Sequence, residues 1–115
     1  MTSLERYVRR VANEMHMKDW EIVLRDEPWK GHEEMDATSH VPWSYAQYGE
    51  LWFNPKSWEK ASLKQRRLLV VHELLHIVIW LAISGDDITA LELVIERLTR
   101  IVMPTIPLPP KAAKP

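Results

Sequence analysis

The chain has 115 residues, a length typical of one domain, so any functional site must be built around a single core. A composition of 46% hydrophobic and 27% charged residues excludes a low-complexity or wholly disordered chain, and the net charge of −1 provides no general attraction for nucleic acid, an anionic membrane or an acidic substrate. The absence of cysteine excludes disulfides, iron–sulfur clusters and thiol nucleophiles, and leaves histidine and carboxylate side chains as candidate metal ligands.

The N-terminal part of the chain combines a helix pattern with a strand pattern. Thr2 and Glu5 have the spacing of a capping box, and apolar residues follow at helical spacing, which predicts an amphipathic helix over residues 3–16. Residues 19–26 then alternate apolar and polar side chains. This period of two predicts a strand with one buried face.

The next segment is predicted to contain a long loop and a second strand. Residues 28–43 are polar, bounded by prolines and without a sustained period, which is typical of a long loop. Residues 45–53 are rich in aromatic side chains and partly alternating, which favours a strand. We expect this strand to pair antiparallel with residues 19–26, in a small antiparallel or mixed sheet.

Two long helices are predicted after this sheet. Ser62 and Gln65 have the spacing of a second capping box, which begins a helix that extends to about Ile83. Ser84-Gly85 is a left-handed stop signal, and Asp86-Asp87 provides the N-cap of the next helix. Because the turn between them is very short, the two helices are expected to be antiparallel neighbours.

The last helix is predicted to extend to about Met103, where Pro104 ends it. The fold class is therefore α+β, with one domain over residues 1–103. Residues 104–115 are rich in proline and are expected to form an extended or disordered tail, a candidate docking segment for a partner.

Three polar residues interrupt the apolar stretch of residues 68–83, namely His72, Glu73 and His76. An unpaired polar group in a core helix costs free energy, so these side chains need a partner. The two histidines are one helical turn apart, and their imidazoles therefore converge. This is the His-Glu-x-x-His spacing, in which both histidines bind zinc and the glutamate takes a proton from a zinc-bound water. The alternative is a pair of core histidines that hydrogen-bond to Glu73 or to backbone carbonyls.

A zinc site needs a third protein ligand, and the following helix offers Glu92 and Glu96. The position around the helix axis favours Glu92, which lies nearer the edge of the apolar face. The position along the axis favours Glu96, because the residue level with His76 in the helical hairpin is near position 95. We prefer Glu92, with Glu96 as its supporting neighbour. Two helices that cross can compensate for an offset along their axes, but not for a side chain on the wrong side of the helix. The glutamate that is not a ligand is expected to be exposed and paired with Arg97 or Arg100.

Residues 70–78, which contain His72-Glu73-Leu74-Leu75-His76, and residues 91–98 resemble the active-site helix and the glutamate helix of gluzincin-type zincin metallopeptidases. The similarity covers about residues 44–103 and is greatest to the smallest members, which include small phage-encoded metallopeptidases. It implies a zincin-like fold with an N-terminal helix and a small mixed sheet over the active-site helix.

The resemblance also implies the roles of individual residues. His72 and His76 would be zinc ligands, Glu73 the general base, and a glutamate on the following helix the third ligand. Thermolysin-like members place that glutamate where Glu96 stands, but Arg100 occupies the position of their aspartate one turn further on. This departure leaves the choice between Glu92 and Glu96 open.

The sequence thus predicts a zinc-dependent hydrolase, most simply a small metallopeptidase in which Glu73 activates a zinc-bound water for attack on a peptide carbonyl. Resemblance to zincins implies that a peptide or protein substrate adds along residues 45–53 as the edge strand. Two alternatives remain: a non-catalytic, zinc-stabilised regulatory or virion-associated protein, and a metal-free helical module that presents the proline-rich tail.

Other features of the sequence are less specific. No signal core or membrane span is recognised, and we expect a cytoplasmic protein, in the host cytoplasm if it is phage-encoded. The basic cluster of Lys60, Lys64, Arg66 and Arg67 is more typical of a solvated helix start than of a nucleic-acid site. The sequence does not choose the group that stabilises the oxyanion, for which the candidates are Tyr45, Tyr48, His32 and His40.

Overall fold

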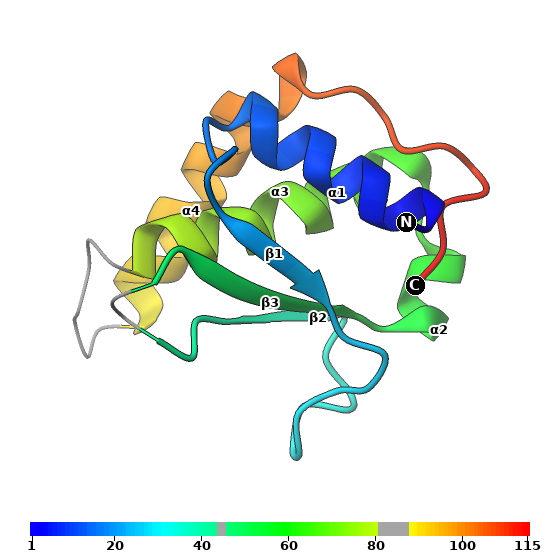
Figure 1. Cartoon of the computed structure of the whole chain (residues 1–115), viewed down its shortest axis with the longest axis horizontal. Coiled ribbons are helices and arrows are strands. Elements are labelled where there is room, and N and C mark those ends of the chain that lie inside the picture. Colours follow the sequence, from blue (N-terminus) through cyan, green and yellow to red (C-terminus); the bar gives the residue numbers. More distant parts are fainter. Residues whose placement is uncertain (44–45, 81–87) are drawn as a thin grey trace.

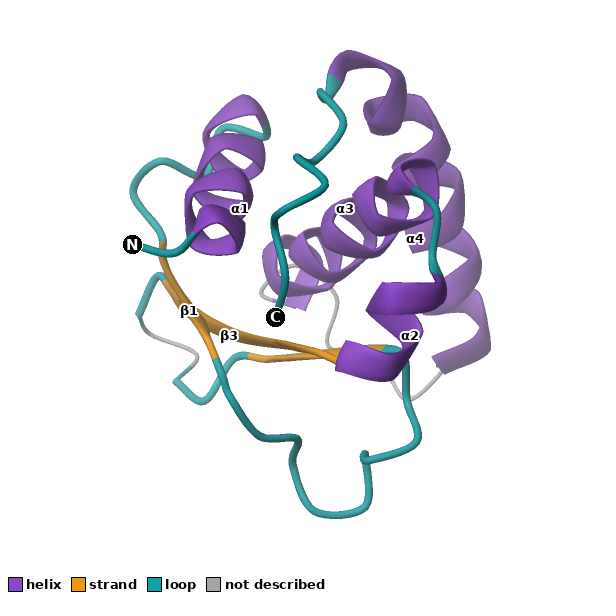
Figure 2. Ribbon diagram, turned by 90° about the vertical axis from the view of Figure 1, so that its right-hand side faces the viewer, coloured by secondary structure: helices purple, strands orange, loops and turns teal. Residues whose placement is uncertain are grey.

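A computed structural model describes residues 1–43, 46–80 and 88–115, which form an α+β fold with a three-stranded mixed sheet. The main helices lie over one face of the sheet, and the long loop that follows the first strand hangs from the other side (Figures 1 and 2). No helix in these ranges is both long enough and apolar enough to cross a membrane. The elements in chain order are α1 (Ser3–Glu14), β1 (Glu21–Leu24), β2 (Ala37–His40), β3 (Tyr48–Phe53), α2 (Pro55–Lys60), α3 (Leu63–Trp80), α4 (Ile88–Val102) and a 3-10 turn, η1 (Met103–Thr105).

Both capping boxes predicted from the sequence form at helix starts. At α1 the Glu5 amide donates to the Thr2 hydroxyl at 3.1 Å and the Thr2 amide donates to the Glu5 carboxylate at 3.0 Å. Before α3 the amides of Ser62 and Gln65 make the same reciprocal bonds with each other's side chains at 2.8 and 3.1 Å. The predicted extension of α3 to Ile83, the stop at residues 84–85 and the N-cap at residues 86–87 lie outside the described residues.

The sheet differs from the prediction in two respects. Its strand order is β1-β3-β2, and β3 pairs parallel with β1 rather than antiparallel. The segment predicted as a continuous loop contains β2, which pairs antiparallel with β3. Strand β3 is therefore central, and the expectation that residues 45–53 form the edge strand is wrong. The edge beside α3 is β2, which holds its place through backbone pairing rather than through an apolar pattern of its own.

Strand β3 lies very close to α3 at a glycine. A Cβ atom at Gly49 would be 2.7 Å from Ile77 Cδ1, shorter than real carbon contacts. Ile77 is fully buried and follows directly after His76 in the chain. The absence of a side chain at Gly49 thus allows the sheet to pack directly against the part of α3 that carries the polar residues.

The proline-rich tail packs against the rest of the molecule. Ile106 and Ala113 are only 2% and 0% exposed. The Tyr7 hydroxyl donates to the Pro107 carbonyl at 2.7 Å, and Trp58 Nε1 donates to the Ala113 carbonyl at 2.8 Å. The tail is extended as expected, but it is an integral part of the fold that joins α1 to α2 (Figure 1).

Removal of residues 106–115 is therefore expected to lower the free energy of unfolding by at least about 2 kcal/mol, the value of one buried isoleucine side chain. Urea denaturation followed by tryptophan fluorescence measures this loss. Removal of residues 114–115, which are exposed, is the matched control and should leave stability unchanged. Equal stability of the two truncated proteins would contradict a structural role for the tail.

Candidate metal centre

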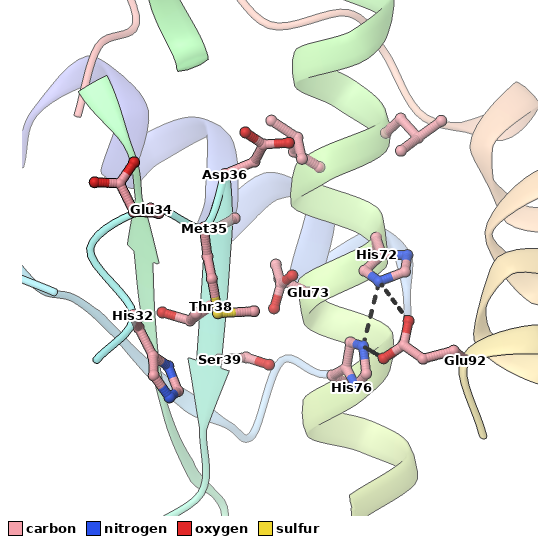
Figure 3. Close-up of a pocket in the computed structure, with 13 residues that line it drawn as sticks. His32, Glu34, Met35, Asp36, Thr38, Ser39, His72, Glu73, His76 and Glu92 are labelled. Atoms are coloured by element: carbon pink, nitrogen blue, oxygen red, sulfur yellow. Dashed lines mark hydrogen bonds and ion pairs between the residues drawn. The ribbon is translucent and has the colours of Figure 1, made fainter. Parts of the chain in front are cut away.

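Helix α3 is a core helix with one polar edge. Most of its second half is buried, and the side chains of His72 and His76 are 23% and 22% exposed on the side that faces α4. Figure 3 shows both imidazoles directed toward Glu92, which reaches across from α4. The helix therefore presents two nitrogen donors to an acid on its neighbour.

The three side chains converge on one point. His72 Nε2 and His76 Nε2 lie 3.2 Å apart, His76 Nε2 lies 2.9 Å from Glu92 Oε1, and His72 Nε2 lies 3.5 Å from Glu92 Oε2. All three ligand atoms lie within 4.8 Å of one another. Each side chain thus directs a lone pair or a proton toward the same small volume.

This arrangement fits a zinc ion. Bonds of about 2.0–2.1 Å in a tetrahedral site separate neighbouring ligand atoms by about 3.3–3.4 Å. The two imidazole nitrogens lie 3.2 Å apart, close to that value, and each lies 2.9 or 3.5 Å from one of the two oxygens of Glu92. Two neutral imidazoles and one carboxylate are also a donor set typical of catalytic zinc, which keeps its fourth position open.

Glu96 lies away from this centre. Its carboxylate pairs with Arg100 at 3.0 Å, and the two side chains are 58% and 71% exposed. The structure thus brings Glu92 to the histidines and pairs Glu96 with Arg100, in agreement with helical phase rather than with height along the hairpin. Binding of zinc by this group stays a prediction.

Glu73 is the buried acid of the site. It is 7% exposed and projects between α3 and β2 (Figure 3), and the Ser39 side chain on β2 is close enough to favour the ionised carboxylate. Burial raises the pKa of Glu73 to about 7; the nearby Glu92 charge also raises it, and the Ser39 side chain opposes the shift. A carboxyl group with such a pKa can exchange a proton near neutral pH.

Burial also affects one of the histidines. It lowers the pKa of His76, and the neighbouring His72 acts in the same direction, while Glu92 opposes the shift. The neutral imidazole is therefore favoured, which is the form that binds a metal ion.

The centre lies in a pocket of about 590 Å³ between α3, α4, β2 and the loop that precedes β2. Glu73 and the three-residue centre line this same pocket. Its volume is within the range of small-molecule and peptide sites. An acid with a raised pKa and a candidate metal centre thus share one solvent-accessible space.

The other candidate residues lie outside the centre. His32 lines the pocket but is exposed and does not join the three ligands, and the His40 ring packs edge-on against Trp29 at 5.6 Å. Tyr48 packs against Trp43 at 4.9 Å, and Tyr45 lies outside the described residues. Among the described candidates, His32, His40 and Tyr48, none belongs to the group of three ligands.

Part of the predicted basic cluster has structural roles. Arg66 donates to the Trp58 carbonyl at 2.8 Å, and Arg67 donates to the Ile106 carbonyl at 3.2 Å. Both side chains are partly buried. These two arginines thereby anchor α2 and the tail.

Sequence reasoning missed Ser39 and the strand that carries it. The four residues of β2, Ala-Thr-Ser-His, have no large apolar side chain, so no alternating pattern marks them as a strand. The β-branched Thr38 was the one local signal, and it is weak.

Comparisons with protein-family models, curated proteins and solved structures find no match to this chain. What this chain does must therefore be inferred from its own residues and their geometry.

The pKa of Glu73 predicts a specific effect of pH on stability. In the folded protein the pKa of Glu73 is about 7, whereas in the unfolded chain it has its ordinary value of 4.5. Between these two pH values the unfolded chain releases the proton more readily, so the free energy of unfolding falls as the pH rises. With zinc removed by chelation, Glu73→Gln should become more stable than the wild type by about 2–3 kcal/mol between pH 4.5 and 7. Urea denaturation at several pH values measures the difference, and a difference independent of pH would contradict the assignment.

Proposed function

We propose that this chain is a zinc-dependent hydrolase, most simply a small metallopeptidase. The observation that carries the proposal is the convergence of His72, His76 and Glu92 on one point, in a pocket that also contains the buried acid Glu73. The resemblance of the His-Glu-x-x-His segment to zincin active-site helices supports the same chemistry.

The residues would divide the work as follows. His72, His76 and Glu92 would hold the ion, and the chemistry it would supply there is Lewis acidity toward a substrate carbonyl and toward water. Glu73 takes a proton from the attacking water and delivers it to the leaving amine, a role that its raised pKa suits. The Ser39 side chain on β2 favours the ionised form of the Glu73 carboxylate.

Strand β2 is the element that could align an extended peptide. Asn54 donates its amide to the Asp36 carbonyl at 2.9 Å, so Asp36 faces β3. Main-chain groups in an antiparallel strand alternate in direction, and those of Ala37 and Ser39 therefore point away from β3. Both residues line the pocket, where a substrate backbone can pair with them.

The ligand assignment predicts different effects for the two glutamates. Glu92→Ala should weaken zinc binding by more than about a hundredfold, because loss of even an outer partner of a zinc ligand costs about ten- to a hundredfold. Glu96→Ala is the matched control on the same helix and should bind zinc like the wild type. Competition with a chromophoric chelator measures both affinities. Equal affinities would remove Glu92 from the centre.

Hydrolysis is tested with Glu73→Gln. This variant should retain about one zinc per chain by elemental analysis, and its kcat on a fluorescent peptide library should fall by about 10²–10⁴-fold, the usual contribution of a general base. Unchanged cleavage would refute the role of Glu73. A wild type that binds zinc, is stabilised by it and cuts no peptide would instead be a non-catalytic, zinc-stabilised protein.

A further inference from the structure

Three cavities follow one another along the first half of α3. The cavity of the candidate metal centre shares Asp36, Leu68 and Leu69 with a middle cavity of about 550 Å³ beside the end of α2. The middle cavity in turn shares Ala61 with a third cavity of about 540 Å³, which α2, the start of α3 and the C-terminal segment line. We call this third space the tail cavity; Figure 1 shows the C-terminus beside α2. A path therefore leads from the metal centre to the tail, with only the small side chain of Ala61 between its last two parts.

The charged side chains along this path change sign. Among the described residues, the cavity of the metal centre is lined by carboxylates and histidines and by no lysine or arginine. The tail cavity is lined instead by three cationic side chains, Arg66, Lys111 and Lys114, and by one carboxylate side chain, Glu59. Because the whole chain has a net charge of −1, this excess of cations is a local property of the tail cavity.

The cations of the tail cavity are not neutralised within the molecule. Arg66 Nε donates to the Trp58 carbonyl at 2.8 Å, and the guanidinium lies 5.4 Å from the Trp58 ring centre. These contacts hold the guanidinium in place but leave its charge uncompensated. In the part of the chain that the structure describes, no carboxylate forms an ion pair with Arg66, Lys111 or Lys114. The tail cavity therefore attracts an anionic group.

The path begins where a peptide on β2 would leave the strand. Asp36 directly precedes β2 and lines both the cavity of the metal centre and the middle cavity. A peptide paired with Ala37 and Ser39 thus passes into the middle cavity, and its next residues can reach the tail cavity. Trp58 and Leu63 give the tail cavity an apolar lining beside its cations, which suits a polypeptide better than a small inorganic anion.

Helix geometry gives the length of this path. Leu63, which lines the tail cavity, precedes His72 by nine residues on α3, a distance of about 14 Å at about 1.5 Å per residue. An extended peptide rises by about 3.3 Å per residue and covers this distance with about four residues. The segment that enters the tail cavity is therefore expected about four to six residues from the bond at the metal centre.

We infer that the tail cavity is a subsite for an acidic segment of the substrate polypeptide, about four to six residues from the scissile bond. The inference rests on the proposed function and narrows its substrates to polypeptides with aspartate or glutamate at that distance. Partly exposed charge pairs are individually weak, so three glutamates at this position should together tighten binding by at least about fivefold at low salt. High salt should remove most of this gain, because it screens exposed charges.

The test uses blocked 24-residue peptides with one central sequence. They carry three glutamates or three glutamines, placed either four to six or nine to eleven residues from the centre, on its N-terminal or its C-terminal side. Each is titrated into the Glu73→Gln protein, with binding followed by fluorescence anisotropy at about 20 and about 500 mM salt. On one side of the centre, glutamates at the nearer spacing should bind at least about fivefold more tightly than glutamines at low salt. Equal affinities for these two peptides would overturn the inference, as would an equal gain at the farther spacing.

A charge-matched pair of variants tests the tail cavity itself. Lys111→Glu with Lys114→Glu reverses two exposed charges in the cavity, and Arg10→Glu with Lys18→Glu reverses two exposed charges outside all three cavities. Both pairs change the net charge equally, and neither alters a buried side chain, so both proteins should fold. Combined with Glu73→Gln, the first pair should abolish the preference for glutamate and the second should keep most of it. A preference that the two pairs reduce equally would overturn the inference.

The two proposals fail in different ways. If the wild type cuts no peptide but the glutamate preference is present and is lost with Lys111 and Lys114, the proposed hydrolysis is wrong and the tail cavity still binds acidic segments. If the wild type cuts the glutamate and glutamine peptides with equal kcat/KM and Glu73→Gln binds them equally, hydrolysis stands and the subsite is refuted.

Discussion

The site depends on one contact between two helices, in which the imidazoles of His72 and His76 meet the carboxylate of Glu92 at 3.5 and 2.9 Å. The contact places three polar groups where α3 is otherwise apolar, and such groups are costly unless something satisfies them together. A bound ion would satisfy all three groups with one set of bonds. The packing of α4 on α3 is thereby tied to the proposed chemistry, because the pocket that contains Glu73 opens around the same point.

The sheet contributes through its order as much as through its residues. Because β3 is central, β2 becomes the strand beside α3 and brings Ser39 to the buried carboxylate of Glu73. Ala37 and Ser39, whose main-chain groups do not face β3, line the pocket. One short strand therefore supports the acid and borders the space where a substrate would lie, and it does so without an apolar pattern of its own.

The sequence predicted those elements that depend on residues close together in the chain. The capping boxes at Thr2 and Ser62 mark helix starts, and helical phase alone places Glu92 rather than Glu96 toward the histidines. The parallel pairing of β1 with β3 and the existence of β2 could not be predicted, because both depend on partners distant in the chain. The packing of the tail was not predicted for the same reason. Its prolines exclude a helix, but the burial of Ile106 depends on a surface that other elements form.

The absence of a side chain at Gly49 has a consequence for the energetics of the proposed metal binding. The sheet presses on Ile77, which leaves the backbone next to His76 little room to shift or rotate. The stretch of α3 that carries the two histidines is therefore held by packing against the sheet, before any ligand arrives. Such preorganisation reduces the entropy that binding must overcome, and it disfavours ions whose preferred coordination would require the two rings to spread apart.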